Sequence, residues 1–174
     1  THDPDPERFD QVLAALAVQD HPNYRVLIVD TGSEVDPTDR VVRALPDARV
    51  LRLPAHLGFG TAANHVLDVV EGAAFYVFAH DDVAPEPDAI SELVDAARAW
   101  DAAIVGPKLV DWNDPRRLRQ VGVAVDRVGT TMPFAEPGEL DQAQHDGLRE
   151  VVAVPGAFTL VDARLFERIG GFDE

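Results

Sequence analysis

Two adjacent carboxylates, Asp81 and Asp82, follow the apolar run Phe75–Ala79, so they stand at the end of a predicted buried strand. Neighbouring like charges repel each other unless water, hydrogen bonds or a cation compensates them. Hard divalent cations such as Mg²⁺ bind one or two carboxylates together with the phosphate oxygens of a substrate. The pair therefore indicates a site for a metal-bound diphosphate. The competing interpretation is two solvated residues before a helix, and His80 beside them fits a ligand, a ribose contact or a polar turn residue.

A glycine-rich turn, His56–Asn64, follows one predicted strand and precedes a predicted helix. Gly58 and Gly60 lack side chains, so the backbone can approach a ligand closely at this turn. The spacing Gly58-x-Gly60-x-x-Ala63 also matches part of a dinucleotide-binding fingerprint, with Asp81 as its acidic ribose ligand. That fingerprint normally follows the first strand of its fold, whereas other strands and helices come first here. The match is weak, and a tight turn explains the glycines equally well.

Two further stretches carry groups that could face a ligand. Asp30 ends the run "VLIVD", where its carboxylate could accept hydrogen bonds from a pyrimidine or guanine ring. Taken alone, an aspartate that caps its own turn is the favoured interpretation. Gly156 and Ala157 present an open backbone beside the acidic pair, or else form a bulge in an edge strand. The six histidines are scattered, and no Ser–His–Asp order or metal-binding histidine pair is persuasive.

Strands and helices alternate around these residues. The predicted helices lie at Pro6–Gln19, Pro37–Pro46, Gly60–Gly72, Pro87–Trp100 and Asp162–Gly171. The predicted strands lie at Tyr24–Asp30, Ala48–Pro54, Ala73–Ala79, within Ala102–Val110, at Leu118–Asp126 and at Val151–Val161, the last of which Pro155 and Gly156 interrupt. Such alternation indicates an α/β fold with a mostly parallel central sheet and helices on both faces. Ligands bind at the carboxyl ends of such strands, and Asp30, Gly58–Gly60 and Asp81–Asp82 all fall there.

Length and charge set further limits. The 174 residues suit one domain, 1–174, in which 128–150 is polar and turn-rich. With 31 acidic and 15 basic residues, the net charge is −16, which argues against a nucleic-acid partner. A nucleotide remains compatible, because backbone N–H groups or a metal can hold its phosphates. The absence of cysteine excludes disulfides and cysteine-ligated zinc. No run is long and apolar enough to span a bilayer.

Together, and in this order, the stretches resemble the family 2 glycosyltransferases of the GT-A type. The resemblance covers nearly the whole chain, and five modest motifs in one order make it specific. The matching stretches are Val29–Ser33, His56–Asn64, His80–Asp82, Gly156–Ala157 and Gly170–Glu174.

The resemblance implies a nucleotide-sugar donor carrying UDP, GDP or dTDP, and a nucleotide-binding half over about residues 1–110. Thr1 and Asp30 would lie beside the base, and the Gly58–Asn64 turn near the ribose and diphosphate. Asp82 would bind Mg²⁺ or Mn²⁺, with Asp81 beside it. The implied donor-binding residues are Thr1, Asp30, Gly58, Gly60, Asn64, His80, Asp81, Gly156 and Ala157, and the implied metal ligands are Asp82 and Asp81.

The implied reaction is an inverting, metal-dependent transfer to a hydroxyl of a carbohydrate or lipid-linked acceptor. The acceptor-side half would be 111–174, and the pathway would build cell-surface polysaccharide or glycolipid. The chain would act in the cytoplasm at the inner face of the membrane, as a piece of a longer protein. His80 departs from the family pattern, which has an acidic residue there. The family's catalytic base follows the "GGFDE" turn, so it is expected beyond Glu174, and this piece alone is expected to be weakly active or inactive.

Two other functions stay open. A non-catalytic module that binds a nucleotide or sugar in a larger protein is favoured by His80 and by the missing base. An NAD-dependent oxidoreductase rests on Gly58-x-Gly60-x-x-Ala63 and would bind its cofactor without a metal.

Overall fold

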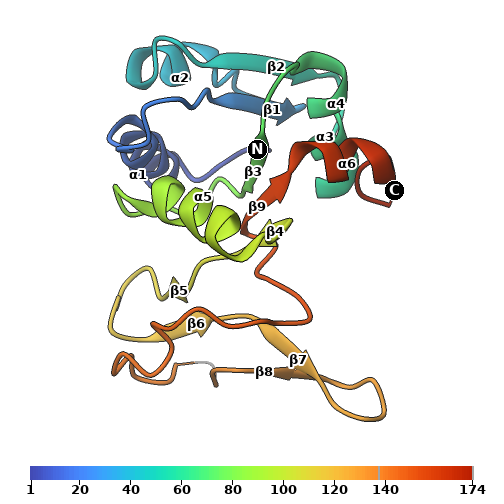
Figure 1. The fold of residues 1–174 in the computed structure, drawn as a ribbon. Helices are drawn as coiled ribbons and strands as arrows, with labels where there is room; N and C mark the ends of the chain where they lie inside the picture. Colours follow the sequence, from blue (N-terminus) through green and yellow to red (C-terminus); the bar gives the residue numbers. More distant parts are fainter. Residues whose placement is uncertain (137, 174) are drawn as a thin grey trace.

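The computed structural model describes residues 1–136 and 138–173 as a mixed α/β fold (Figure 1). The helices are α1 (Pro6–Ala17), α2 (Thr38–Ala44), α3 (Phe59–Asn64), α4 (Val66–Val69), α5 (Ala89–Trp100) and α6 (Ala163–Ile169). The strands are β1 (Leu27–Thr31), β2 (Arg49–Leu53), β3 (Phe75–Ala79), β4 (Ile104–Val105), β5 (Leu109–Val110), β6 (Leu118–Gln120), β7 (Val123–Val125), β8 (Thr131–Pro133) and β9 (Phe158–Asp162).

Strand pairing differs from the parallel sheet that the alternation predicts. β1 and β2 pair in parallel. β9, from near the end of the chain, lies between β3 and β4 and is antiparallel to both. Among the described strands β1–β2 is the one parallel pair, so a mostly parallel central sheet is not confirmed. The order of local elements could not show that a strand some 80 residues after β3 would separate β3 from β4.

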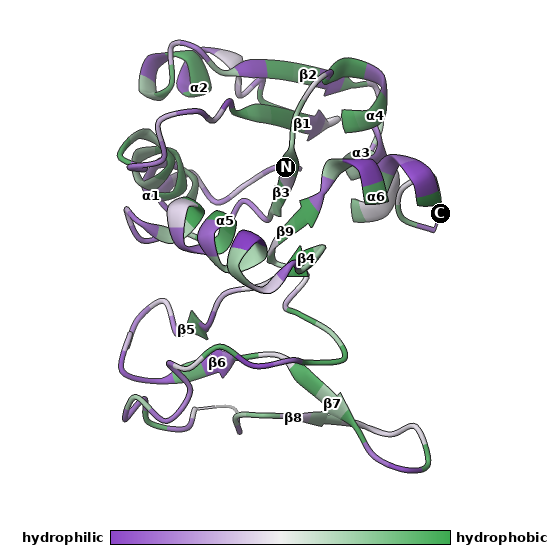
Figure 2. Ribbon diagram, in the orientation of Figure 1, coloured by the Kyte–Doolittle hydropathy of each residue, from purple (hydrophilic) through white to green (hydrophobic). Residues whose placement is uncertain are grey.

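Helices cover both faces of the β3–β9–β4 sheet, as expected. On one face, Phe158 and Leu160 of β9 pack against Ile90 and Leu93 of α5. On the other face, Tyr76 and Phe78 of β3 pack with Val161 of β9 and with Phe166 of α6. A third cluster joins α1 and α2 to β1 and β2. Figure 2 shows that most of β1 and of β9 is hydrophobic.

The segment between β4 and β9 forms small antiparallel pairs. β5 pairs with β6, and β7 pairs with β8, below the larger part of the fold in the view of Figure 1. Lys108 holds the turn-rich segment through ion pairs to Asp141 at 2.6 Å and Asp146 at 2.5 Å. The chain then returns to the larger part as β9 and α6.

Several predicted elements are shorter or interrupted in the structure, and the strand expected at Leu118–Asp126 divides into β6 and β7. The helix expected at Gly60–Gly72 breaks at His65 into α3 and α4, and Val70 is already extended. Its valines are β-branched and stiff, which lowers helix propensity. In the stretch Val151–Val161, β9 begins at Phe158, after the predicted interruption at Pro155 and Gly156, because Pro155 has no N–H to donate to a ladder. By contrast, α6 is confirmed, and the carboxylate of its N-cap Asp162 accepts a hydrogen bond from the Leu165 N–H.

An apolar cavity of about 450 Å³ separates β1 from β3. Its walls come from both strands and from helices on both faces, including Val12 of α1, Ala63 of α3 and Ile90 of α5. One end lies where β1 and β3 finish, beside the residues that the sequence singled out.

Candidate functional site

The acidic corner, by which we mean His80, Asp81 and Asp82 together with Ala157, follows β3 directly. The His80 N–H donates to the carbonyl of Ala157 at 2.9 Å, which continues the β3–β9 ladder by one residue. Asp81 and Asp82 then form a turn, with Asp81 partly buried and Asp82 exposed. The structure therefore brings Asp81, His80 and Ala157 together. A Cβ added at Gly156 would meet nothing within 4 Å in the described structure, so the backbone is open at this position.

The carboxylate oxygens of Asp81 and Asp82 are ligands that suit a hard divalent cation. Among the described residues, no group of three or more His, Asp or Glu side chains forms a complete metal cage. Mg²⁺ does not need one, since it commonly uses one or two carboxylates and takes its other oxygens from water and substrate phosphates. The two carboxylates at 81 and 82, one of them exposed, suit that mode of binding.

Thr1 lies at the same end of the cavity as Asp81. Its α-amino group donates to the Val29 carbonyl at 2.7 Å, and its carbonyl accepts from the Thr31 N–H at 2.9 Å. Burial lowers the pKa of this amino group, and the nearby carboxylates of Asp81 and Asp30 oppose that shift. Thr1 and Asp81 are therefore close enough to interact electrostatically.

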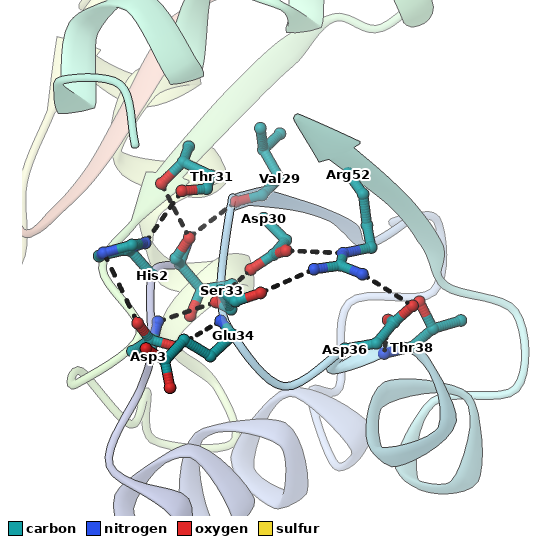
Figure 3. Close-up of polar contacts among 11 residues, drawn as sticks. His2, Asp3, Val29, Asp30, Thr31, Ser33, Glu34, Asp36, Thr38 and Arg52 are labelled. Carbon is teal, nitrogen blue, oxygen red and sulfur yellow. Dashed lines mark hydrogen bonds and ion pairs between the residues drawn. The ribbon is translucent and has the colours of Figure 1, made fainter. Parts of the chain in front are cut away.

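Asp30 is engaged within the protein (Figure 3). Its side chain is fully buried, and its two oxygens accept from the Ser33 hydroxyl and, at 2.9 Å, from the Arg52 Nε. Arg52 lies opposite Asp30 on β2, away from β3. The Asp30 carboxylate is thus already paired, and its expected contact to a base remains a prediction.

The ion pair fixes the turn after β1. Arg52 also donates to the Ser33 carbonyl at 2.8 Å and pairs with Asp36 at 3.0 Å. Hydrogen bonds from Thr38, together with the Arg52 charge, hold the pKa of Asp36 below its usual range. The Asp3 N–H donates to the Ser33 hydroxyl at 2.8 Å, so the turn is held from both sides (Figure 3).

The glycine-rich turn packs against the far end of the chain. A side chain at Gly60 would lie 3.1 Å from Phe172 Cβ and from the Asp173 carbonyl. Asn64 donates to the Phe172 carbonyl at 2.9 Å and accepts from the Phe172 N–H at 2.8 Å. Gly171 has φ +90°, and a Cβ there would collide with the Asn64 amide. Gly60, Asn64 and Gly171 therefore hold the glycine-rich turn against the turn that contains Gly171 and Phe172. We call this contact the interlock, and the sequence did not reveal it.

Aromatic rings connect this interlock to the acidic corner. The Phe59 ring lies 4.7 Å from the His80 ring and 5.8 Å from the Phe172 ring, centroid to centroid. Phe172 also contacts Phe78 and Phe166 edge-on. The position of His80 thus depends on the turn that Asn64 holds.

Sequence reasoning missed two histidines at the cavity. His2 and His56 line it together with His80, and the His2 and His56 rings are 4.1 Å apart. His56 also contacts the Thr31 hydroxyl at 3.3 Å. Their positions in the sequence could have indicated them, because His2 directly follows Thr1 and His56 is the first residue of the glycine-rich turn.

The Arg52–Asp30 pair predicts a large effect from a single substitution. Arg52→Met leaves a buried carboxylate without its cationic partner, and should lower the free energy of unfolding by about 1–3 kcal/mol. Arg40→Met is the matched control, because Arg40 and Asp10 form a solvent-exposed pair at 3.6 Å. The control should lose less than about 1 kcal/mol. Equal losses in urea denaturation would contradict the structural role of the buried pair.

The interlock predicts coupling between Asn64 and Gly171. Asn64→Ala removes the obstacle to a Cβ at position 171, so Gly171→Ala should be less destabilising in that background. A double-mutant cycle measured by chemical denaturation should give a coupling free energy of about 0.5–3 kcal/mol. Gly129→Ala is the control, since Gly129 also has positive φ (+84°) but faces open space in the described structure. A coupling of zero for the Asn64–Gly171 pair would disprove the interlock.

Comparison with known proteins agrees with the motifs. The family model for Glycosyl transferase family 2 matches residues 5–170. Proteins from two strains of Mycobacterium tuberculosis, CDC 1551 / Oshkosh and ATCC 25618 / H37Rv, are each 32% identical over 197 residues. Both are named N-acetylglucosaminyl-diphospho-decaprenol L-rhamnosyltransferase. The match covers 100% of this chain but 63% of the length of each relative. The chain belongs to glycosyl transferase family 2.

Proposed function

We propose that this chain is the donor-binding part of an enzyme that transfers a sugar from a nucleotide-diphosphate sugar to an acceptor hydroxyl. Family membership supports the reaction class and implies the GT-A fold. The observation that carries the proposal is the acidic corner, where Asp81 and Asp82 follow β3 beside the carbonyl of Ala157. Two carboxylates next to an accessible backbone suit a metal-bound diphosphate.

The donor would lie along the carboxyl ends of β1 and β3. Its base would lie near Thr1 and the turn after Asp30, and its diphosphate near the Gly58 turn and Asp82. Gly58 precedes α3 and faces open space in the described structure, which leaves room for a ligand. We assign Gly60 and Asn64 to this site through the turn that they hold, because the Asn64 amide is already bonded to Phe172.

Asp82, with Asp81 beside it, would hold Mg²⁺ or Mn²⁺ against the donor diphosphate. A divalent cation there would stabilise the negative charge of the departing nucleoside diphosphate. His80, Asp81 and the Gly156–Ala157 backbone would orient the donor. In an inverting transfer the acceptor oxygen attacks from the side opposite the leaving group. The catalytic base stays a prediction for a residue after Glu174, which is outside the described residues.

The acceptor is proposed from the relatives. Their name specifies a diphospho-decaprenol carrying N-acetylglucosamine as the molecule they act on. We infer a lipid-linked acceptor here too, a role in cell-surface polysaccharide or glycolipid synthesis, and work at the inner face of the membrane. Within the described residues, no helix has the length and hydropathy needed to cross a bilayer. The segment 111–174 would provide the acceptor side, where Lys108 secures the turn-rich loop through Asp141.

A non-catalytic nucleotide- or sugar-binding module is the second candidate. It is favoured by His80, whose ring packs at a tilt against Phe59 and supplies no carboxylate at the first position of the acidic motif. Such a module would bind the donor without turning it over. Nucleotide binding and sugar transfer therefore need separate measurements.

Calorimetric titration with UDP, GDP, dTDP and NADH, with and without Mn²⁺, tests the proposed site. One nucleoside diphosphate should bind in a metal-dependent manner. Asp82→Asn should weaken that binding at least tenfold, or about 1.4 kcal/mol, because it removes a charged ligand. Asp88→Asn is the matched control, since Asp88 is an exposed aspartate shortly after the acidic pair, and it should bind like the parent chain. Metal-independent NADH binding that Asp82→Asn does not change would refute the transferase site.

A further inference from the structure

Gly106 lies where two segments of the chain come into close contact. It directly follows β4, and its φ is outside the left-handed region that favours glycine. A Cβ at this position would lie 2.5 Å from the Cβ of Val154 and 2.9 Å from the Cδ of Pro155. The first of these atoms is bonded to the backbone and the second belongs to a proline ring, so no side-chain rotation could make room. The close approach of Val154 and Pro155 therefore explains why this position holds a glycine.

The segment that packs against Gly106 continues directly into a turn. In this turn, Pro155–Phe158, the Pro155 carbonyl accepts hydrogen bonds from the Phe158 N–H at 3.4 Å and from the Thr159 hydroxyl. The side chains of Pro155 and Thr159 are both buried. The first residue of the turn is thus held by packing on one side and by hydrogen bonds on the other.

The turn connects the β4 side of the sheet with the acidic corner. β9 lies between β3 and β4, and the turn leads into β9. Pro155 contacts the Gly106 position next to β4, whereas the Ala157 carbonyl accepts from the His80 N–H, next to β3, at 2.9 Å. Only Gly156 separates Pro155 from Ala157. Because closely packed segments transmit a displacement to their neighbours, a shift of Pro155 should reach the acidic corner.

We propose that Gly106 is a positioning residue for the acidic corner and acts through the Pro155–Phe158 turn. Close packing at Gly106 fixes the turn, and the turn fixes the Ala157 carbonyl to which His80 is bonded. A side chain at 106 would push the turn away from β4. The expected effect on nucleotide binding rests on the proposed function, whereas the expected effect on the backbone at His80 does not.

Hydrogen exchange tests the effect on the backbone. Gly106→Ala should weaken the bond between the His80 N–H and Ala157, and should speed exchange of the His80 amide at least about tenfold. The amide of Tyr76, which lies opposite Val161 in the same β3–β9 ladder, is the internal reference and should change little. Gly147→Ala is the matched control, because a Cβ at Gly147 would meet nothing within 4 Å in the described structure.

Calorimetric titration with UDP, GDP and dTDP in the presence of Mn²⁺ tests the effect on binding. Gly106→Ala should weaken binding at least about tenfold, since a small misplacement of site residues has large effects, and Gly147→Ala should bind like the parent chain. Val154→Gly removes the nearest obstacle to the new Cβ. The double variant should therefore bind at least about threefold more tightly than Gly106→Ala alone. A further glycine lowers the overall stability, so stability alone would not produce this rescue.

The pattern of exchange and rescue decides the outcome. Faster exchange at His80 with little change at Tyr76, together with rescue by Val154→Gly, would support the proposal. Equal acceleration at both amides, or a Gly106→Ala variant that behaves like Gly147→Ala, would overturn it. If no nucleoside diphosphate binds to the parent chain, the proposed function fails, and exchange at His80 still decides whether Gly106 positions the corner.

A second pair of variants serves if Gly106→Ala does not fold. Thr159→Val removes the hydroxyl that bonds to the Pro155 carbonyl, whereas Thr159→Ser keeps a hydroxyl there. Exchange of the His80 amide should be at least about threefold faster in Thr159→Val than in Thr159→Ser, because one hydrogen bond that holds the turn is lost. Equal exchange in the two variants would overturn the role of the turn and, with it, the proposal.

Discussion

The pairing of β9 with β3 is the constraint on which both the fold and the site depend. β9 comes from the end of the chain, yet Leu160, fully buried on β9, packs between strands and α5 at the centre of the larger part. The same ladder extends to the bond between the His80 N–H and Ala157. The backbone geometry that holds the core together therefore also sets where the acidic pair lies. The site cannot be moved without disturbing the sheet.

A second long-range contact joins the glycine-rich turn to the last residues of the chain. Asn64 and Phe172 are 108 residues apart in sequence and share two hydrogen bonds. Through Phe172 and Phe59 this contact reaches the His80 ring. The glycine-rich turn and the last residues of the chain thus lie together beside His80, next to the negative charges of Asp81 and Asp82. In the proposed function, a cation and a diphosphate would compensate the repulsion between these two carboxylates.

Much of the fold could be predicted from local sequence. Helical spacing of Phe9, Val12 and Leu13 after an Asp5–Pro6 start predicted α1, and Asp162 predicted the start of α6. Strand direction could not be predicted, because it depends on where β9 inserts. The break at His65 was also missed, since the amphipathic pattern continues through it while β-branched valines end the helix.

The candidate site was predicted in part. The acidic pair is recognisable from residue type and from its position after a strand, and the Gly156–Ala157 backbone from its small residues just before β9. The pairing of Asp30 with Arg52 was not, because a strand-end aspartate gives the same local pattern whether it faces a ligand or a neighbouring strand. Gly60 was interpreted as permitting approach of a ligand, whereas in the structure a turn of the chain itself approaches it. Both contacts join segments that are far apart in the sequence, so the residue spacing within one segment could not predict them.

The most direct test of the account is the position of a bound divalent cation, measured by Mn²⁺-induced broadening of backbone amide resonances in the presence of a nucleoside diphosphate. The account predicts broadening centred on His80, Asp81, Asp82 and Ala157, and much weaker effects when the nucleotide is omitted. Broadening centred on another acidic region, such as the loop that contains Asp141 and Asp146, would contradict it. So would broadening at Asp81 and Asp82 that is unchanged by the nucleotide, since the diphosphate is expected to complete the metal site.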